Sequence, residues 1–185
     1  IDTRKEIVAR AAVLSGAELV NDVSGLTFDP DLVLFCAEEN LPVCIMHSKG
    51  LPEKMQDGPV YDDVVLDVYD FLEDKINRLV RKGIARNRII ADPGIGFGKT
   101  MMHNLALLNK ISLFHSLGVP LLLGVSRKGF IGKITKEHVA EARVIGSISA
   151  ALTGVSQGVQ IFRVHDVKET RQAFDMWQTI MFGRE

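Results

Sequence analysis

Short apolar runs alternate with longer amphipathic stretches along the whole chain. Each run is strand-length, rich in Val, Ile or Leu, and lacks polar alternation; the runs cover residues 17–20, 41–46, 88–91, 119–125 and 159–164. Such runs are typical of strands buried on both faces, as in a parallel sheet. Because repeated strand–helix units form right-handed βαβ crossovers, the alternation predicts an α/β fold of about five parallel strands, with a strand stub at residues 1–3.

The helical stretches between the runs are marked by their spacing and by their ends. Over residues 62–81, apolar side chains recur at steps of one, three and four, which places one apolar stripe on a helix. Asp29 followed by Pro30 has the form of an N-cap with proline at the first helical position. Asp166, with Glu169 three residues later, has capping-box spacing and predicts another helix start.

Polar clusters follow the apolar runs and favour one architecture over another. The clusters begin at Asp2, Asn21, Met46, Asp92, Ser126 and Arg163. In a (β/α)₈ barrel, the carboxyl ends of all strands open onto one face, and the site is built from several of them. An open doubly wound sheet instead concentrates its ligand at one switch point. Polar clusters at this many strand ends favour the barrel, although the pattern of apolar runs alone does not distinguish the barrel from the open sheet.

The composition is that of a globular domain. The chain has 185 residues, 46% of them apolar and 24% charged, with a formal net charge of −1. A near-neutral charge gives no electrostatic footprint for nucleic acid or an anionic membrane. No apolar run approaches the roughly 18 residues of a membrane span, and no export leader is visible. We therefore expect a single cytoplasmic domain over residues 1–185, with Cys36 and Cys44 as buried thiols because they lack CxxC spacing.

The densest polar cluster covers residues 92–100 and contains three alternating glycines. It is not a P-loop, because GxxxxGK requires glycine where Pro93 stands, and it does not match GxGxxG. Alternating glycines let the backbone approach a ligand closely, and the alternative is a tight strand-to-helix turn capped by Asp92. A carboxylate at a barrel mouth needs donors. The edge of a 2-amino-pyrimidinone ring would supply two to Asp92, while Asn21 can both donate and accept, unless it only forms an Asx turn.

Two later clusters carry cationic side chains. Residues 126–129, Ser-Arg-Lys-Gly, suit an anion or a carbonyl-rich substrate, with a solvated basic loop as the alternative. Arg163 and His165 are two residues apart on a predicted strand, so they point the same way and can face one anion. The alternative is that His165 packs against the following helix. Phosphate sites after the last strands of barrels are frequent, which favours the anion site.

The cluster that starts at Met46 is less specific. Met46 can form a wall for a flat ring, although a core position is the simpler interpretation. His47 has no metal-ligand partner three or four residues later and does not indicate zinc. The remaining histidines are expected on helix surfaces; they are His103, His115 and His138.

Taken in order, these motifs resemble those of the dihydropteroate synthase family over essentially the whole chain. The block from Asp92 to Lys99, followed by Ser126-Arg127-Lys128 and then Arg163-Val164-His165, is specific in this order. The other matching motifs are Ile1-Asp2-Thr3, Asn21-Asp22-Val23-Ser24-Gly25, Met46-His47 through Gly50 to Met55-Gln56, Tyr61-Asp62-Asp63-Val64-Val65 and Asp166-Val167.

The resemblance implies a (β/α)₈ TIM barrel, N-terminally incomplete, that runs from the end of strand 3 through helix 8. It implies the condensation of 6-hydroxymethyl-7,8-dihydropterin diphosphate with p-aminobenzoate, with release of diphosphate, in folate biosynthesis. It also implies Mg²⁺ as cofactor, with the expected metal ligand outside this chain, and a homodimer. By the same resemblance, the pterin is held by Asp2, Asn21, Met46, Asp92 and Lys128, p-aminobenzoate by Phe97, Ser126 and Lys128, and diphosphate by Arg163 and His165.

The implied reaction makes particular electrostatic demands. As diphosphate leaves, positive charge grows on the pterin methylene and negative charge on the leaving group. We expect Asp2 and Asp92 to stabilise the first, and Arg163, His165 and Mg²⁺ the second, with Asp2, Asp92 and Lys128 as the catalytic residues. No triad that would form a covalent intermediate is visible.

One departure from the family pattern limits what these residues can do alone. The family has two further strand–helix units before the Ile-Asp-Thr motif, including an Asn that contacts metal and diphosphate. We therefore predict that the 185 residues alone do not turn over substrate. Two other hypotheses remain open: a pterin-binding methyltransferase barrel, and an inactive truncated barrel kept as an interaction domain.

Overall fold

The computed structural model describes residues 1–49 and 59–183 and shows an α/β fold with parallel strands. Within those residues, the helices and strands alternate along the chain. Their bounds are α1 Glu6–Leu14, β1 Val20–Asp22, α2 Pro30–Glu38, β2 Val43–Met46, α3 Val64–Arg81, β3 Ile89–Asp92, α4 Met101–Asn109, β4 Leu122–Leu123, α5 Gly129–Thr135, α6 Val144–Ser156, β5 Ile161–Phe162 and α7 Val167–Phe182, with short 3₁₀ turns at Arg86–Arg88, Ile111–Leu117 and Glu141–Arg143.

The strands lie side by side in chain order. β1, β2 and β3 form one parallel sheet, and β4 pairs in parallel with β5. Isolated parallel bridges extend this row at two points, Asp2 to Asn21 and Ala91 to Leu121. The prediction of parallel strands is therefore confirmed, and every strand presents its carboxyl end on the same side.

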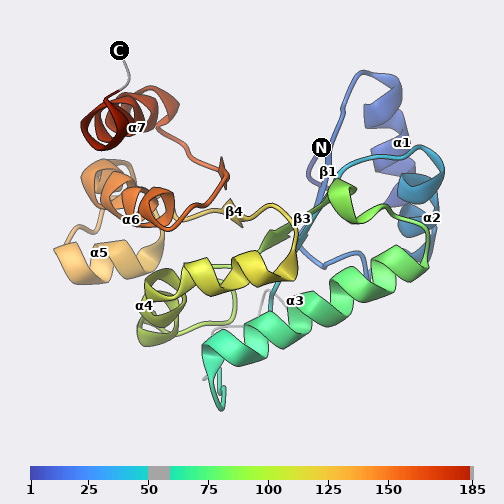
Figure 1. Ribbon diagram of the computed structural model, residues 1–185, viewed down its shortest axis with the longest axis horizontal. Coiled ribbons are helices and arrows are strands. Elements are labelled where there is room, and N and C mark those ends of the chain that lie inside the picture. Colours follow the sequence, from blue (N-terminus) through green and yellow to red (C-terminus); the bar gives the residue numbers. More distant parts are fainter. Residues whose placement is uncertain (50–58, 184–185) are drawn as a thin grey trace.

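The helices form an arc outside the strands, in order from α1 to α7 (Figure 1). The arc is open between α1 and α7, near the point where the chain begins. Apolar side chains fill the space between strands and helices, and Ile45, Leu72, Leu107, Phe114 and Leu123 are fully buried there. No helix in the described part of the chain is long and apolar enough to cross a membrane.

All five strands differ from the predicted runs at their ends, β2 and β3 by only one or two residues. The first strand starts at Val20, not Ala17, and continues through Asp22. Asn21 belongs to it because its N–H donates to the Ile1 carbonyl and its carbonyl accepts from Thr3 N–H, at 2.8 and 3.1 Å. The runs at 119–125 and 159–164 pair as regular strand only over 122–123 and 161–162, since the Leu121 N–H bonds to the Gln160 side chain instead.

All three predicted helix starts are confirmed, including that of α7 at Val167 with Asp166 in the N-cap position, and only the capping box at Asp166 is not. α3 occupies most of 62–81, and Asp63 caps its first turn. Asp29 caps α2 through the N–H of Asp31, with Pro30 at the first position. The predicted capping box at Asp166 is wrong: its side chain makes no cap hydrogen bond to α7, because the carboxylate binds Arg127. Cys36 and Cys44 are buried free thiols, as expected, and burial raises the pKa of Cys36 to about 11.

Candidate active site

A pocket of about 320 Å³ lies at the carboxyl ends of the strands, and residues from β1 to β5 and their loops line it. It gathers most of the side chains that the sequence analysis selected. The lining residues are Asn21, Val23, Met46, Asp92, Phe97, Leu122, Gly124, Ser126, Lys128, Arg163, Val164 and His165. Asp2 is placed beside this lining: its carboxylate lies 2.9 Å from the Arg163 guanidinium, which itself lines the pocket.

Asp92 ends β3 and contributes the carboxylate of the pocket lining. One carboxylate oxygen accepts a 2.7 Å hydrogen bond from the N–H of Gly94. Burial raises the pKa of Asp92 to about 6, although the Gly94 N–H and the charges of Lys128, Lys99 and Arg163 oppose the rise. A carboxylate in this state gains from any ligand that brings N–H donors to it.

The two polar residues of β1, Asn21 and Asp22, have different roles. Asn21 lines the pocket. Asp22 is fully buried, and its carboxylate accepts from Ser24 N–H, Ser24 Oγ and Leu26 N–H at 2.7 to 3.0 Å. The turn-forming role that was the alternative for this pair therefore belongs to Asp22. Met46, at the end of β2, is both 4% exposed and part of the lining, so it is a core residue and a wall at once.

The glycine loop, residues 94–99, packs directly on the backbone that follows β2. Gly94 has φ +70°, and a Cβ there would overlap the carbonyl oxygen of His47. Gly98 has φ +61°, and a Cβ there would lie 2.5 Å from the carbonyl oxygen of Lys49. Only glycine allows this approach without strain.

Lys99 holds this loop from within, a feature that the sequence analysis missed. The residue is 3% exposed. Its ammonium donates to the carbonyls of Gly94, Phe97 and His47 at 2.9, 3.0 and 3.3 Å, and lies 2.8 Å from His47 Nδ1. Burial lowers the pKa of Lys99 to about 7, with Asp92 opposing the fall. Lys99 therefore points away from the pocket, unlike a P-loop lysine.

His47 is the neutral partner of this cage. Burial, and then the charge of Lys99, lower the pKa of His47 to about 3, so its Nδ1 accepts from the ammonium. The ring packs edge-on against Phe71, with centroids 4.8 Å apart. His47 directly follows β2, and Lys99 lies in the loop after the neighbouring strand β3. This placement in neighbouring loops is the feature of the sequence that could have predicted their contact.

Lys128 and Phe97 form the side of the pocket next to Asp92. The Lys128 ammonium lies 4.2 Å from the centroid of the Phe97 ring, within cation–π distance. Burial lowers the pKa of Lys128, and the charge of Asp92 opposes this. Lys128 thus places a positive charge close enough to the Asp92 carboxylate to lower the pKa of that group.

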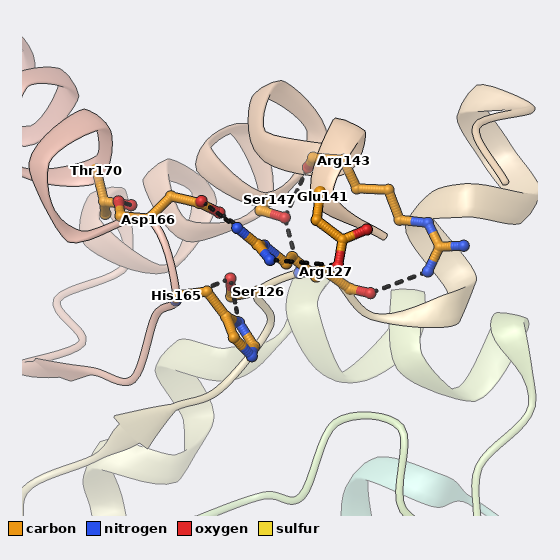
Figure 2. A network of polar contacts seen from close by, with 8 residues as sticks. All are labelled: Ser126, Arg127, Glu141, Arg143, Ser147, His165, Asp166 and Thr170. Atoms are coloured by element: carbon orange, nitrogen blue, oxygen red, sulfur yellow. Dashed lines mark hydrogen bonds and ion pairs between the residues drawn. The ribbon is translucent and has the colours of Figure 1, made fainter. Parts of the chain in front are cut away.

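Arg163 and His165 both line the pocket beyond β5. The ring Nδ1 of His165 lies 2.9 Å from the Ser126 hydroxyl oxygen, and the backbone N–H of His165 donates to the same oxygen at 3.2 Å. Arg127, expected with Lys128 to offer charge to an anion, turns away from the pocket and binds Asp166 (Figure 2). The cations in the pocket lining are therefore Lys128 and Arg163.

The expected Mg²⁺ site is not assembled by the residues that the structure describes. Within 1–49 and 59–183, no three His, Cys, Asp or Glu side chains gather as a cation site. The nearest acid to the anion end, Asp2, is engaged by Arg163. Gly50 and Met55-Gln56 of the matching motifs lie outside the described residues.

This chain is similar to a protein family and to curated proteins over most of its length. The pterin binding enzyme family matches residues 1–165. Dihydropteroate synthase of Escherichia coli (strain K12) is 40% identical over 185 residues, which are 100% of this chain and 65% of that protein. This chain therefore spans about 65% of the length of the curated relatives it matches.

Solved structures are similar over the same extent. Dihydropteroate synthase from Stenotrophomonas maltophilia, with active site-bound imidazole, gives a TM-score of 0.95 at 40% identity over 100% of this chain and 69% of that chain. The enzyme from Xanthomonas albilineans in complex with 7,8-dihydropteroate gives 0.91 at 40% identity, over 98% and 66%. At 40% identity, the likeness is one of sequence as well as of fold.

Proposed function

This chain belongs to the pterin binding enzyme family, and we propose that its pocket serves dihydropteroate synthesis. In this reaction, 6-hydroxymethyl-7,8-dihydropterin diphosphate condenses with p-aminobenzoate and releases diphosphate. The observation that carries the proposal is the polarity of the pocket. The Asp92 carboxylate lines it together with the cationic side chains of Lys128 and Arg163 and the imidazole of His165.

The pocket's polarity matches the charge that the reaction develops. The 2-amino-pyrimidinone edge of the pterin brings N–H donors to Asp92, and Asn21 complements the mixed edge beside it. Positive charge that grows on the pterin methylene is stabilised by the Asp92 carboxylate. The guanidinium of Arg163 and the imidazole of His165 face the departing diphosphate, where donors fixed in advance are most effective.

The second substrate has its own side of the pocket. Phe97 offers an aromatic face, and Ser126 and Lys128 offer polar groups beside it. An aromatic amine needs no strong general base, because its lone pair attacks the methylene as diphosphate departs. The proposed roles of Asp92 and Lys128 as catalytic groups are electrostatic, and Asp2 acts with them through its contact to Arg163.

Further elements of the proposal concern architecture and assembly. We place the strand row as the last six strands of a (β/α)₈ barrel, in one domain over residues 1–185, and expect a cytoplasmic enzyme. A homodimer remains a prediction that rests on the family resemblance. Mg²⁺ remains a prediction, because it rests on the family resemblance.

Calorimetry with pterin diphosphate and with plain 6-hydroxymethylpterin tests the proposal. We expect the diphosphate form to bind more tightly, Asp92→Ala to weaken both ligands, and Arg163→Ala to weaken only the diphosphate form. Arg171→Ala is the matched control, since Arg171 is exposed on α7 and paired with Asp175. Equal affinity for both ligands would favour a pterin-binding methyltransferase, and folded protein without pterin binding would favour an interaction domain.

A further inference from the structure

The loops that follow β4 and β5 are joined by two pairs of neighbouring residues. Ser126 pairs with His165 at the pocket, and Arg127 pairs with Asp166 outside it (Figure 2). We propose that Arg127 and Asp166 are positioning residues that hold Ser126, Lys128 and His165 in register. For its ligand-binding consequence, this inference rests on the function proposed above.

The backbone of Arg127 is the first observation. Its φ of +58° lies in the left-handed region, which non-glycine residues seldom adopt. Both backbone groups are held: the N–H donates to Ser147 Oγ at 2.8 Å, and the carbonyl accepts from Arg143 Nη1 at 3.0 Å. Ser147 is in turn tied to the carbonyl of Arg143 at 2.7 Å. An unfavourable conformation kept by this many contacts indicates a constrained site.

The side chain of Arg127 supplies the link to β5. Its Nε and Nη2 donate to the two carboxylate oxygens of Asp166 at 3.1 and 2.6 Å. This two-point geometry fixes orientation as well as distance. The pair raises the pKa of Arg127 and lowers the pKa of Asp166, so both stay charged. Glu141 reaches the other side of the guanidinium at 3.8 Å from a position 73% exposed.

Asp166 gives up another role for this contact. It stands at the N-cap of α7, where a carboxylate normally accepts from the first-turn N–H groups, yet its side chain makes no such bond. Its carboxylate points at Arg127 instead (Figure 2). Because Asp166 follows His165 directly, this orientation also sets where the imidazole meets Ser126.

The consequence is that two subsites share one support. Ser126 and Lys128 flank Arg127 and line the p-aminobenzoate side, while His165 precedes Asp166 and lines the diphosphate side. Arg127 contributes no charge to the pocket; it fixes the residues on either side of it. Loss of the Arg127–Asp166 pair therefore acts most strongly on the diphosphate contact of His165, and less on the pterin, which Asn21, Met46 and Asp92 still contact through a part of the pocket that the pair does not hold.

Asp166→Asn, which removes the charge and keeps the shape, is the primary test, with Glu169→Gln as matched control. Glu169 is an exposed acid one turn along α7. Two-dimensional NMR of the ligand-free chain should show the Arg127 Nε–H signal and the amide signals of Ser126, Lys128 and His165 shifting in Asp166→Asn but not in the control. Calorimetry should show pterin diphosphate weakened about tenfold, with plain 6-hydroxymethylpterin changed less than about twofold.

Arg127→Lys provides an independent variant, because lysine keeps the charge but cannot form the two-point contact. It should reproduce the effect of Asp166→Asn, and the double variant should be no weaker than either single one. Unchanged NMR signals in Ser126 and His165 would overturn the inference even if no ligand bound. Equal weakening of both ligands would show a merely structural role. A wild-type chain that binds neither ligand would refute the proposed function, while the NMR comparison would still decide the positioning role.

Discussion

Two neighbouring loops carry much of the pocket, and they are held by opposite means. The glycine loop after β3 presents Phe97 and follows Asp92, and the loop after β4 presents Ser126 and Lys128. The first is held from inside, by the buried Lys99 ammonium and carbonyl oxygens. The second is held from outside, by a partly exposed ion pair between side chains 25% and 13% accessible.

The difference determines what each loop responds to. Hydrogen bonds in a water-free cage gain strength from low local dielectric and are barely screened by salt. An ion pair that is partly exposed to solvent contributes less to stability, because water and salt screen the attraction between its charges. We therefore expect damage to the glycine loop to appear as loss of folding stability, and damage to the loop after β4 to appear mainly as loss of ligand binding.

The largest expected effect comes from Gly94→Ala in the glycine loop. The new Cβ would overlap the His47 carbonyl oxygen and would also hold alanine at φ +70°. We expect the free energy of unfolding to fall by at least about 3 kcal/mol, as measured by urea denaturation. Gly16→Ala is the control, because Gly16 has φ +99° but nothing within 4 Å, so it isolates the backbone term of about 1 kcal/mol. Equal losses at both positions would argue against close packing of the glycine loop.

Lys99→Met should have the next largest effect. The variant fills the same space but leaves the carbonyls of Gly94 and Phe97 without their donor. Because buried unsatisfied carbonyls are unfavourable, we expect a loss of about 2 to 3 kcal/mol, partly offset by removal of a buried charge. Lys168→Met, on the exposed surface of α7, should change stability by less than about 0.5 kcal/mol. A neutral Lys99→Met would mean that the cage does not hold the loop.

The pH dependence of stability should carry the signature of Lys99. Its folded pKa is about 7, below the ordinary 10.5, so above pH 7 the unfolded chain holds a proton that the folded chain has released. Stability therefore rises with pH from about 7, by roughly 1.4 kcal/mol per pH unit at most. Denaturation at pH 7 and 8 tests this below the range where the buried thiols and Tyr61 act in the opposite direction. The Lys99→Met variant should lack the rise, and an equal rise in the variant would assign it to other groups.

Much of the fold and of the pocket could be predicted from local sequence patterns. The side chains whose positions could not be predicted share a cause. Strand-length apolar runs predicted the parallel row, and the clusters after the runs contain the polar side chains of the pocket lining, whereas Val23, Leu122, Gly124 and Val164 were not predicted. Arg163 and His165 share the pocket because strand alternation is a local rule. Lys99 and Arg127 escaped prediction, since their directions are set by His47 and Asp166, which are distant in sequence.

The smallest expected effect concerns Asp2, which links the two ends of the strand row through Arg163. The side chains of this pair are 48% and 63% exposed, so water and salt screen the attraction. We expect Asp2→Asn to lower the free energy of unfolding by less than about 0.5 kcal/mol, and the difference to vanish in 0.5 M salt. Asp175→Asn, in the exposed Arg171 pair of α7, is the control and should behave alike. A loss as large as that of Lys99→Met that persists in 0.5 M salt would show that the Asp2–Arg163 pair stabilises the fold as strongly as a buried contact. The contrast between buried and exposed contacts would then not hold at the edge of the strand row.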